Sequence, residues 1–414
     1  MWQRLKRLSP LFLFVAVACE DSDVPVEIVP ETPPLLETPA DLSLSLSHWD
    51  ALDGWGQSDL RPALDAFMRS CERMEPRPDG ENLNPRAPWA GTVGAWRDVC
   101  VTAALTGDEP GAVRATFEAL FSPVSVTAIE TDSGDVRHDG LLTGYYEPLL
   151  EVRSEPVEGF TQPLRARPDD LLSVDLGRFD PELAGHRIVA RVEDGELVRY
   201  RNRADIEAGD FGEAFAWGRP IDVFFLQIQG SGRLIFEDGR QARAAFNAHN
   251  GLPYRSIGRE LINRGELARH AASKAGIEAW LNENGPEATA ELFSVNPRYV
   301  FFGVETLDQP ELGPRGSSGV SLTPMASLAV DTGFHAHGVP IWMTTDLPDA
   351  AGWSGLLVSQ DSGGAINGPL RGDFFWGWGQ EAERRAGTTN ARAQWTVLLP
   401  HAVADRIVDL TPPA

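Results

Sequence analysis

Residues 360–379 read QDSGGAINGPLRGDFFWGWG, a stretch that combines two aspartates with many glycines and aromatic residues. Glycine lets the backbone adopt positive φ angles and approach a ligand closely. Asp373 is followed by apolar residues and glycine, surroundings that disfavour an ionised carboxylate, so we expect its pKa to lie above the ordinary value of about 3.9. A carboxyl with a raised pKa can act as a general acid near neutral pH. On spacing alone, Asp361 and Asp373 could instead only hold turns.

The rest of the composition favours a turn-rich β protein with flanking helices. The chain has 414 residues, with 40 glycines, 31 prolines, 19 phenylalanines and 12 tryptophans. Because one domain usually contains about 100–200 residues, we expect about two domains. Many short strands separated by glycine turns are typical of small closed barrels.

Hydrophobic periodicity predicts helices early in the chain and strands later. We expect helices at 59–74, 93–105, 110–121, 256–263 and 278–282. Two hairpins are predicted, at 188–200 around Asp194-Gly195 and from 234–236 to beyond Asp238-Gly239. The apolar run 223–229 is predicted to be a strand, on which Gln227 and Gln229 would share one face. Further strands are expected at 299–304, 327–330, 339–344, 355–359, 373–376 and 395–398.

The N-terminus has the pattern of an export signal. Basic residues precede the apolar run 11–15, and Ala16-Val17-Ala18 precedes Cys19, so residues 1–18 are predicted to be a lipoprotein signal peptide and Cys19 a lipid anchor. Residues 19–41 are rich in proline and acidic residues and are expected to form a disordered tether. Cleavage that leaves Cys19 as a free thiol is the alternative.

Two further cysteines, Cys71 and Cys100, would lie in an oxidising compartment. They could form a disulfide or remain two buried thiols on helices. The scattered histidines predict no metal site, and no cofactor is expected. The formal net charge of −24 disfavours a nucleic-acid partner, because such proteins usually carry a basic surface.

Five ordered motifs and the stretch at 360–379, six in all, resemble the membrane-bound lytic murein transglycosylase A family and its C-terminal three-aspartate (3D) domain. The five motifs are TGYYEP at 143–148, QIQGSG at 227–232, NG at 250–251 with YRSIG at 254–258, NPR at 296–298 before VFF at 300–302, and LTP at 322–324. The resemblance implies a double-psi β-barrel domain at 42–143 and 292–414, with a second β-barrel domain inserted at 144–291. A groove at their junction would bind a glycan strand.

The resemblance also implies roles for individual residues. Asp373 would be catalytic, and Asp361 and Asp346 would shape the site. Where the family often has lysine, this chain has Asn367, which can form hydrogen bonds but carries no charge. The residues expected to bind substrate are Tyr145, Tyr146, Glu147, Gln227, Gln229, Ser231, Gly232, Tyr254, Thr323, Gly364 and Asn367.

The activity implied is non-hydrolytic cleavage of the bond between N-acetylmuramic acid and N-acetylglucosamine in peptidoglycan, with a 1,6-anhydro product. A single aspartic acid would give a proton and later recover one. A non-catalytic glycan-binding lipoprotein and a muramidase that uses Asp361 as second carboxylate are the alternatives. We expect a periplasmic monomer attached by its lipid to the outer membrane, with peptidoglycan strands as its partner.

Overall fold

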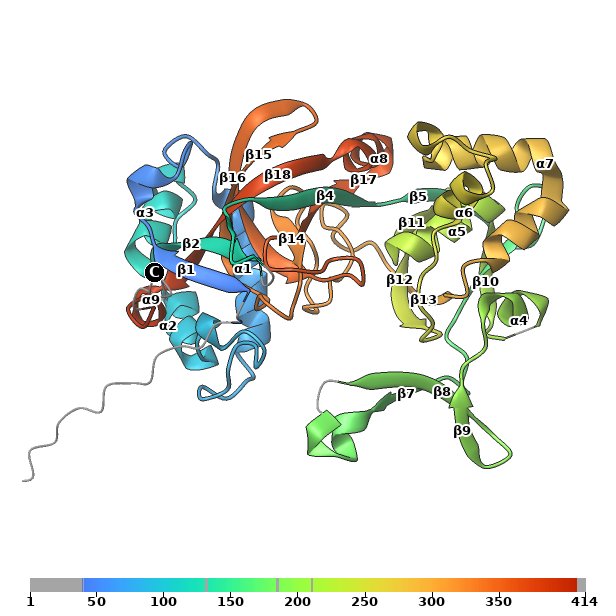
Figure 1. Cartoon of the computed structure of the whole chain (residues 1–414), viewed down its shortest axis with the longest axis horizontal. Coiled ribbons are helices and arrows are strands. Elements are labelled where there is room, and N and C mark those ends of the chain that lie inside the picture. The colour runs from blue at the N-terminus through green and yellow to red at the C-terminus, as the bar shows by residue number, and fades with distance from the viewer. Residues whose placement is uncertain (1–38, 40, 131–132, 184–185, 210, 408–414) are drawn as a thin grey trace, which may run out of the picture. The chain divides into compact units, whose positions relative to one another are not determined.

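The computed structural model describes residues 39, 41–130, 133–183, 186–209 and 211–407 (Figure 1). The predicted signal peptide, Cys19 and almost all of the predicted tether lie outside these residues. Regular structure in the described chain begins with the strand at Leu42, as expected. Among the described helices, none combines the length and the apolar character needed to cross a membrane.

A nine-stranded sheet combines segments from both ends of the described chain. Its strands are β1 (Leu42–Leu46), β2 (Phe121–Ile129), β3 (Val136–Arg137), β4 (Gly140–Glu147), β14 (Ser327–Val330), β15 (Pro340–Leu347), β16 (Ala350–Asp361), β17 (Gly372–Trp378) and β18 (Asn390–Pro400). In Figure 1, the blue strand β1 and the red strand β18 both pair with β2. Because β4 pairs with both β17 and β18, the path β18-β15-β16-β14-β17-β4 closes into a barrel. The predicted fold class, mainly β with a barrel domain, is therefore confirmed.

The chain between β4 and β14 forms two further sheets. The larger has the order β13-β12-β11-β5-β10-β6 and is barrel-like, because its last strand, β6, also contacts β13. Its strands are β5 (Leu149–Arg153), β6 (Gln162–Arg165), β10 (Ala214–Gly218), β11 (Gly232–Ile235), β12 (Gln241–His249) and β13 (Val300–Glu305). The small sheet consists of β7 (Leu172–Asp175), β8 (Arg187–Glu193) and β9 (Glu196–Arg199). Strands up to Glu147 belong to the nine-stranded sheet, strands from Leu149 to Glu305 belong to the other two sheets, and later strands belong to the nine-stranded sheet again. The sequence predicts the insert at 144–291.

The predicted hairpins are present, and their turns explain why. Asp194 and Gly195 both have positive φ, at 51° and 82°, which is the conformation that an Asp-Gly turn between two strands requires. Gly239 likewise has φ of 82° between β11 and β12.

The helices of the described chain are α1 (Arg61–Met74), α2 (Val93–Ala103), α3 (Pro110–Leu120), α4 (Arg203–Ala208), α5 (Pro220–Gln229), α6 (Ile257–Asn263), α7 (Lys274–Ser294), α8 (Gly379–Thr388) and α9 (His401–Ala404), with short 3-10 turns at Trp49–Ala51, Pro88–Ala90, Leu176–Arg178, Pro181–Leu183 and Arg269–Ala271. Of these, α1, α2, α3 and α6 begin and end within two residues of the predicted helices, α7 is longer than the predicted helix at 278–282, and α4, α5, α8 and α9 were not predicted as helices. In α1, Leu64, Phe67 and Cys71 are buried, because residues three and four apart share one helix face.

The prediction of a strand at 223–229 was wrong, since this segment is the helix α5. Pro220 occupies the first turn and Gly230 ends the helix with φ of 86°, which are the usual start and stop residues of a helix. A short continuous apolar run does not distinguish a buried strand from a buried helix.

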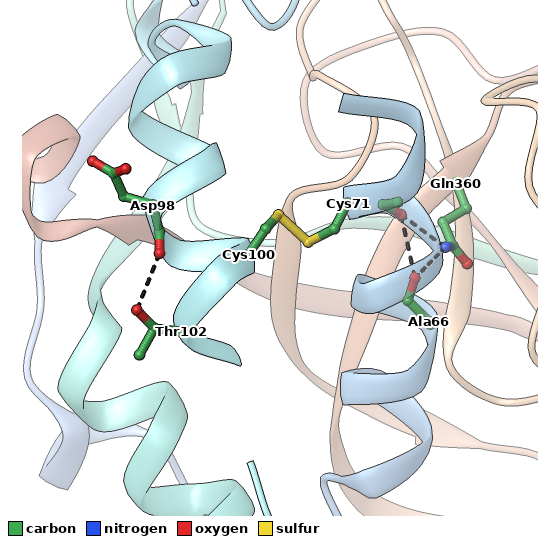
Figure 2. Close-up of a disulfide and its surroundings, with 7 residues drawn as sticks. Ala66, Cys71, Asp98, Cys100, Thr102 and Gln360 are labelled. Atoms are coloured by element: carbon green, nitrogen blue, oxygen red, sulfur yellow. Dashed lines mark hydrogen bonds between the residues drawn. A yellow bond between two sulfur atoms is a disulfide. The ribbon is translucent and has the colours of Figure 1, made fainter. Parts of the chain in front are cut away.

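A disulfide and a buried glutamine attach α1 to its surroundings. Cys71 and Cys100 form a disulfide that joins α1 to α2, which settles the alternative that the sequence left open (Figure 2). On the other side of α1, Gln360 Nε2 donates to Ala66 O at 2.7 Å and to Ser70 Oγ at 2.9 Å (Figure 2). Gln360 is fully buried and directly precedes Asp361 in β16, so α1 supports the strand end that carries this aspartate.

A buried ionic cluster joins the two larger sheets. Glu147, at the end of β4, accepts from Arg233 Nε at 2.8 Å and from Arg243 Nε at 2.5 Å, and its side chain is 0% exposed. Both arginines also donate to Leu312 O, at 2.9 Å and 2.8 Å. The Arg233 guanidinium lies over the Trp378 ring, 3.7 Å from its centroid. Each charged group therefore has several partners, which offsets the large free-energy cost of taking charges out of water.

We predict that replacing Cys71 and Cys100 together by alanine lowers the free energy of unfolding by about 3–4 kcal/mol, because the disulfide closes a loop across a separation of 29 residues. Chemical denaturation of a chain that starts after Cys19 measures this effect. A reductant should lower the denaturant concentration at the midpoint of unfolding for the wild type and leave that of the variant unchanged. Equal midpoints for the two proteins without reductant would contradict the prediction.

We predict that Glu147→Gln lowers the free energy of unfolding by about 3–5 kcal/mol, because it leaves two buried guanidinium groups without a negative partner. Glu151→Gln is the matched control, since the side chain of Glu151 is 73% exposed, and it should change stability by less than about 0.5 kcal/mol. Urea denaturation compares the two variants, and similar midpoints would rule out a stabilising role for the ionic cluster.

Candidate active site

Asp373 lies on β17 between β4 and β14, directly opposite Thr143 and Ala329. Thr143 Oγ1 donates to Asp373 Oδ1 at 2.6 Å. Arg371 Nη2 in turn donates to Thr143 Oγ1 at 2.8 Å. Burial raises the pKa of Asp373 to about 6 and the charge of Asp361 adds to this, whereas the bond from Thr143 and the charge of Arg371 lower it. The carboxyl is therefore partly protonated near neutral pH.

Asp361, the last residue of β16, is held by three hydrogen bonds. Its Oδ1 accepts from Ser317 N at 2.8 Å and Ser362 N at 2.9 Å, and its Oδ2 accepts from Tyr145 Oη at 3.0 Å. Burial raises the pKa of Asp361, while these hydrogen bonds act in the opposite direction. The Tyr145 ring packs against Phe375, with centroids 5.2 Å apart. Asp361 is thus fixed in position by β4 and by two loops.

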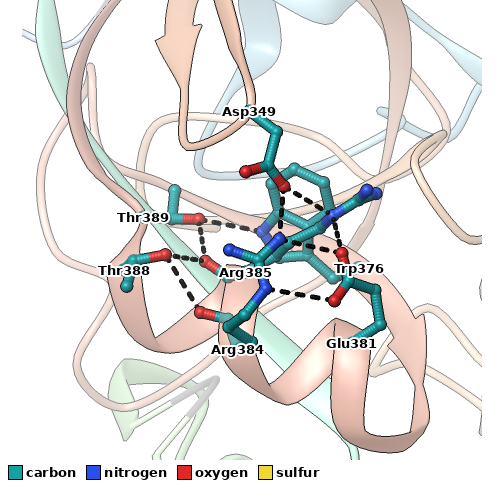
Figure 3. A network of polar contacts seen from close by, with 7 residues as sticks. All are labelled: Asp349, Trp376, Glu381, Arg384, Arg385, Thr388 and Thr389. Atoms are coloured by element: carbon teal, nitrogen blue, oxygen red, sulfur yellow. Dashed lines mark hydrogen bonds and ion pairs between the residues drawn. The ribbon is translucent and has the colours of Figure 1, made fainter.

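The opposite face of β17 is anchored by α8, which follows it in the chain. Trp376 Nε1 donates to Thr389 Oγ1 at 2.9 Å, and the Arg385 guanidinium lies 5.4 Å from the Trp376 ring centroid. Arg384 and Arg385 form ion pairs with Asp349 and Glu381 (Figure 3). Trp376 is buried in the core of the barrel, and because strand residues alternate between faces, Asp373 points to the other side.

Asp361 and Asp373 line one cavity of about 610 Å³, which is formed by strands, loops and α5. Its lining brings together seven residues that the sequence singles out: Tyr145, Gln227, Gln229, Tyr254, Asp361, Gly364 and Asp373. Gln227 and Gln229 reach it from the C-terminal end of α5, not from one face of a strand. The cavity therefore collects residues from segments that are far apart in the sequence.

Tyr146, Glu147, Ser231 and Gly232, also expected to bind substrate, are not part of this lining. Tyr146 is buried in the barrel core, on the other face of β4 from Tyr145. Glu147 belongs to the ionic cluster described above. Ser231 Oγ accepts from Phe246 N at 3.3 Å. A Cβ on Gly232 would come within 2.4 Å of the Leu226 side chain, so packing alone explains this glycine.

Thr323, Asn367 and Asp346 also lie outside the lining. Thr323 Oγ1 accepts from Arg69 Nη2. Asn367 is exposed, and its Nδ2 donates to Gly364 O at 3.3 Å, within the glycine-rich loop. Asp346 is exposed near the β15–β16 turn, where its Oδ1 accepts from Gly352 N at 2.7 Å. The hydrogen bond of Asp346 thus holds a hairpin turn.

The lining also contains Arg203, Asn296 and Arg298, to which the sequence analysis assigned no role. Arg203 is 1% exposed and donates to Gln227 Oε1 at 2.5 Å and to Asn296 O at 3.0 Å. The hydrogen bond from Arg203 fixes the orientation of the Gln227 amide, which lines the cavity. Asn296 and Arg298 could have been found from the sequence, because they belong to the motif at 296–298. Arg203 lies in no recognised motif.

Asp331 is another residue that the sequence analysis missed. Its Oδ2 accepts from Gly368 N at 2.7 Å, and its Oδ1 accepts from Gly333 N at 2.8 Å. It therefore ties the end of β14 to the glycine-rich loop that leads from Asp361 to Asp373. The sequence pattern that could have revealed Asp331 is an aspartate two residues before a glycine, at the end of a predicted strand.

Two family models match the chain. Residues 141–303 match the MltA specific insert domain, and residues 326–399 match the 3D domain. These segments correspond to the inserted sheets with their helices and to the second part of the barrel, which carries Asp361 and Asp373.

Named relatives agree with the family models. The membrane-bound lytic murein transglycosylase A of Vibrio cholerae is 30% identical over 278 residues, which cover 65% of this chain and 68% of that protein. The crystal structure of a membrane-bound lytic murein transglycosylase from Agrobacterium tumefaciens is 29% identical, covers 88% of this chain and 100% of its own, and has a TM-score of 0.74. The structure of MltA from Neisseria gonorrhoeae is 29% identical, covers 89% of this chain and 95% of its own, and has a TM-score of 0.73. The chain therefore belongs to the membrane-bound lytic murein transglycosylase A family.

Proposed function

We propose that this lytic transglycosylase cleaves the β-1,4 bond between N-acetylmuramic acid and N-acetylglucosamine and forms a 1,6-anhydro end, with Asp373 as its only acid and base. The observation that carries the proposal is the state of Asp373, a cavity-lining carboxyl with a pKa of about 6. Such a group is protonated often enough to give a proton at neutral pH and ionises readily enough to take one back.

Thr143 determines which oxygen of Asp373 carries the proton. A guanidinium has no acceptor, so Arg371 must donate to Thr143 Oγ1. The single hydroxyl proton of Thr143 is then directed to Asp373 Oδ1. The acidic proton of neutral Asp373 therefore belongs on Oδ2, which has no hydrogen-bond partner among the residues that the structure describes. Oδ2 is the oxygen that would transfer the proton.

The reaction then requires no second carboxylate and no water. Asp373 Oδ2 gives its proton to the glycosidic oxygen as the bond from that oxygen to C1 of the muramic sugar breaks, and positive charge develops at C1 and the ring oxygen. The ionised Asp373 next takes the proton from the C6 hydroxyl of the same sugar, and O6 forms the new bond to C1. Asp373 is protonated again at the end of the cycle, ready for the next bond.

Asp361 supports the site in this proposal and is not a nucleophile. A muramidase would need a second carboxylate about 5–9.5 Å from the acid that is free to attack C1 or to activate water. Asp361 already accepts three hydrogen bonds, which fix both of its oxygens. Tyr145, Gln227, Gln229, Tyr254 and Gly364 line the same cavity and would contact the glycan strand.

Attachment to the membrane also belongs to this proposal. Acylation of Cys19, removal of residues 1–18 and a tether over 19–41 would hold a monomeric enzyme at the outer membrane, within reach of peptidoglycan in the periplasm. Relatives with the name membrane-bound lytic murein transglycosylase A support this location.

We predict that Asp373→Asn lowers the rate of release of 1,6-anhydro muropeptides by about 10²–10⁴-fold, the usual contribution of a general acid and base. Mass analysis of digested peptidoglycan measures the products. Asp98→Asn, at an exposed position on α2, is the matched control and should keep the wild-type rate. Release of reducing ends by the wild type would instead favour a muramidase, and release of no product would favour a glycan-binding protein.

We predict that kcat/KM falls as the pH rises above about 6, because only the protonated form of Asp373 can start the reaction. The hydroxyl of Thr143 lowers this pKa, so its removal in Thr143→Val should move the fall to higher pH and also lower kcat. Thr143→Ser retains the hydroxyl and should keep the wild-type pH profile. A fall at the same pH in the valine variant would exclude the proposed role of Thr143.

A further inference from the structure

A second cavity lies next to the one that contains Asp373, and we call it the arginine cavity. Its volume is about 710 Å³, and Ser362 lines both cavities. Ser317, which also lines the arginine cavity, and Ser362 both donate their backbone N–H groups to Asp361 Oδ1. The two cavities therefore adjoin at Ser362, beside Asp361.

The charge of the arginine cavity is opposite to that of the whole protein. The chain has 60 acidic and 36 basic residues, yet the lining contains four arginines and neither aspartate nor glutamate. The four are Arg73, Arg77, Arg86 and Arg187. A local positive cavity on an acidic protein concentrates anions.

Most of this positive charge is not neutralised within the protein. Arg77 pairs with Glu81 at 2.6 Å. Arg86 Nη2 donates at 2.7 Å to Thr332 Oγ1, which is neutral. Arg73, Arg86 and Arg187 form no ion pair with a carboxylate in the part of the chain that the structure describes. These three side chains retain donors for an external partner.

Gly319 allows Arg73 to lie close to the neighbouring loop. It has φ of 83°, and a Cβ on this residue would come within 3.2 Å of Arg73 Nε. The lining also contains the amide of Asn84 and the hydroxyl groups of Ser317, Ser318 and Thr332. Guanidinium groups beside amide and hydroxyl groups match a ligand that carries both carboxylates and peptide bonds.

We propose that the arginine cavity binds the carboxylates of the peptide stem on the muramic acid residue at the cleavage site. This inference rests on the proposed function, because only that function brings a muramic acid residue to Asp373. The stem leaves the sugar from the lactyl group on C3, close to the reacting C1, and its glutamate and diamino acid residues carry free carboxylates. Arg73 and Arg86 are the specificity-determining residues, since a guanidinium can bind a carboxylate through two parallel hydrogen bonds.

The test compares two substrates, intact glycan strands with peptide stems and the same strands after an amidase has removed the stems. The measured quantity is the ratio of kcat/KM for the stem-bearing strands to kcat/KM for the denuded strands. We expect the wild type to prefer stem-bearing strands, and we expect this ratio to fall about tenfold, mainly through KM, in the double variant Arg73→Ala with Arg86→Ala. Substitution of both residues by lysine should restore part of the ratio, because the charge returns without the planar fork.

Arg259→Ala is the matched control, since Arg259 is exposed on α6 and outside both cavities, and it should keep the wild-type ratio. A wild-type ratio of one, or an unchanged ratio in the double variant, would overturn the proposal. Stem-bearing strands with amidated carboxyl groups should behave like denuded strands, and a preference that survives amidation would also overturn it.

A binding measurement separates this proposal from the proposed function. The free stem tetrapeptide is titrated into wild type and double variant, and chemical shifts of the protein are recorded at constant ionic strength. Saturable binding that the double variant loses supports the arginine cavity even if the wild type cleaves neither substrate, a result that would count against the proposed function alone. Displacement of the peptide by equimolar phosphate would show a general anion site and would overturn the assignment to the stem.

Discussion

The architecture depends on the buried carboxylate of Glu147 and its two arginine partners. Glu147 is the last residue of the barrel strand β4, and Arg233 and Arg243 lie on strands of the inserted sheet. Only Pro148 separates β4 from β5, the first strand of the insert, so the ionic cluster fixes the chain where it passes between the two sheets. The cavity with Asp373 uses residues from both segments, and its shape follows from this fixed junction. A neutral pair at this point would lack the strong, directional attraction that two charged donors on one carboxylate provide.

Sequence patterns predicted most of the fold where local rules suffice. The strand at 327–330 is found with the predicted ends, and the Asp194-Gly195 turn has the backbone conformation that its residues favour. The run at 223–229 shows where such rules stop, because Phe224, Phe225 and Leu226 are compatible with a buried strand and a buried helix alike. The closure of the barrel by β4 and β18 has no local signal and came only from the resemblance to a known family.

The site could be predicted only in part, again because local sequence rules do not describe contacts between distant segments. Alternation along β4 leaves Tyr145 in the cavity and Tyr146 in the core, but the sequence does not say which of two adjacent tyrosines faces which side. Glu147 was expected to bind substrate because of the family resemblance, whereas it compensates the charges of Arg233 and Arg243, 86 and 96 residues away in the sequence. The supporting contacts of Arg203 and Asp331 were missed because they are tertiary hydrogen bonds between segments with no shared pattern.

The insertion between β4 and β14 has a consequence for how the enzyme is made. Thr143 and Asp373 are 230 residues apart in the chain, and the barrel closes only when β18 pairs with β4. The strand that carries Thr143 therefore cannot complete the barrel until the chain through β18 is present. The inserted sheets use only residues between β4 and β14, so their strands do not depend on the C-terminal segment, whereas the site around the reacting carboxyl does. A nascent or truncated chain therefore contains no working catalytic centre, and cleavage of the wall must await a finished polypeptide.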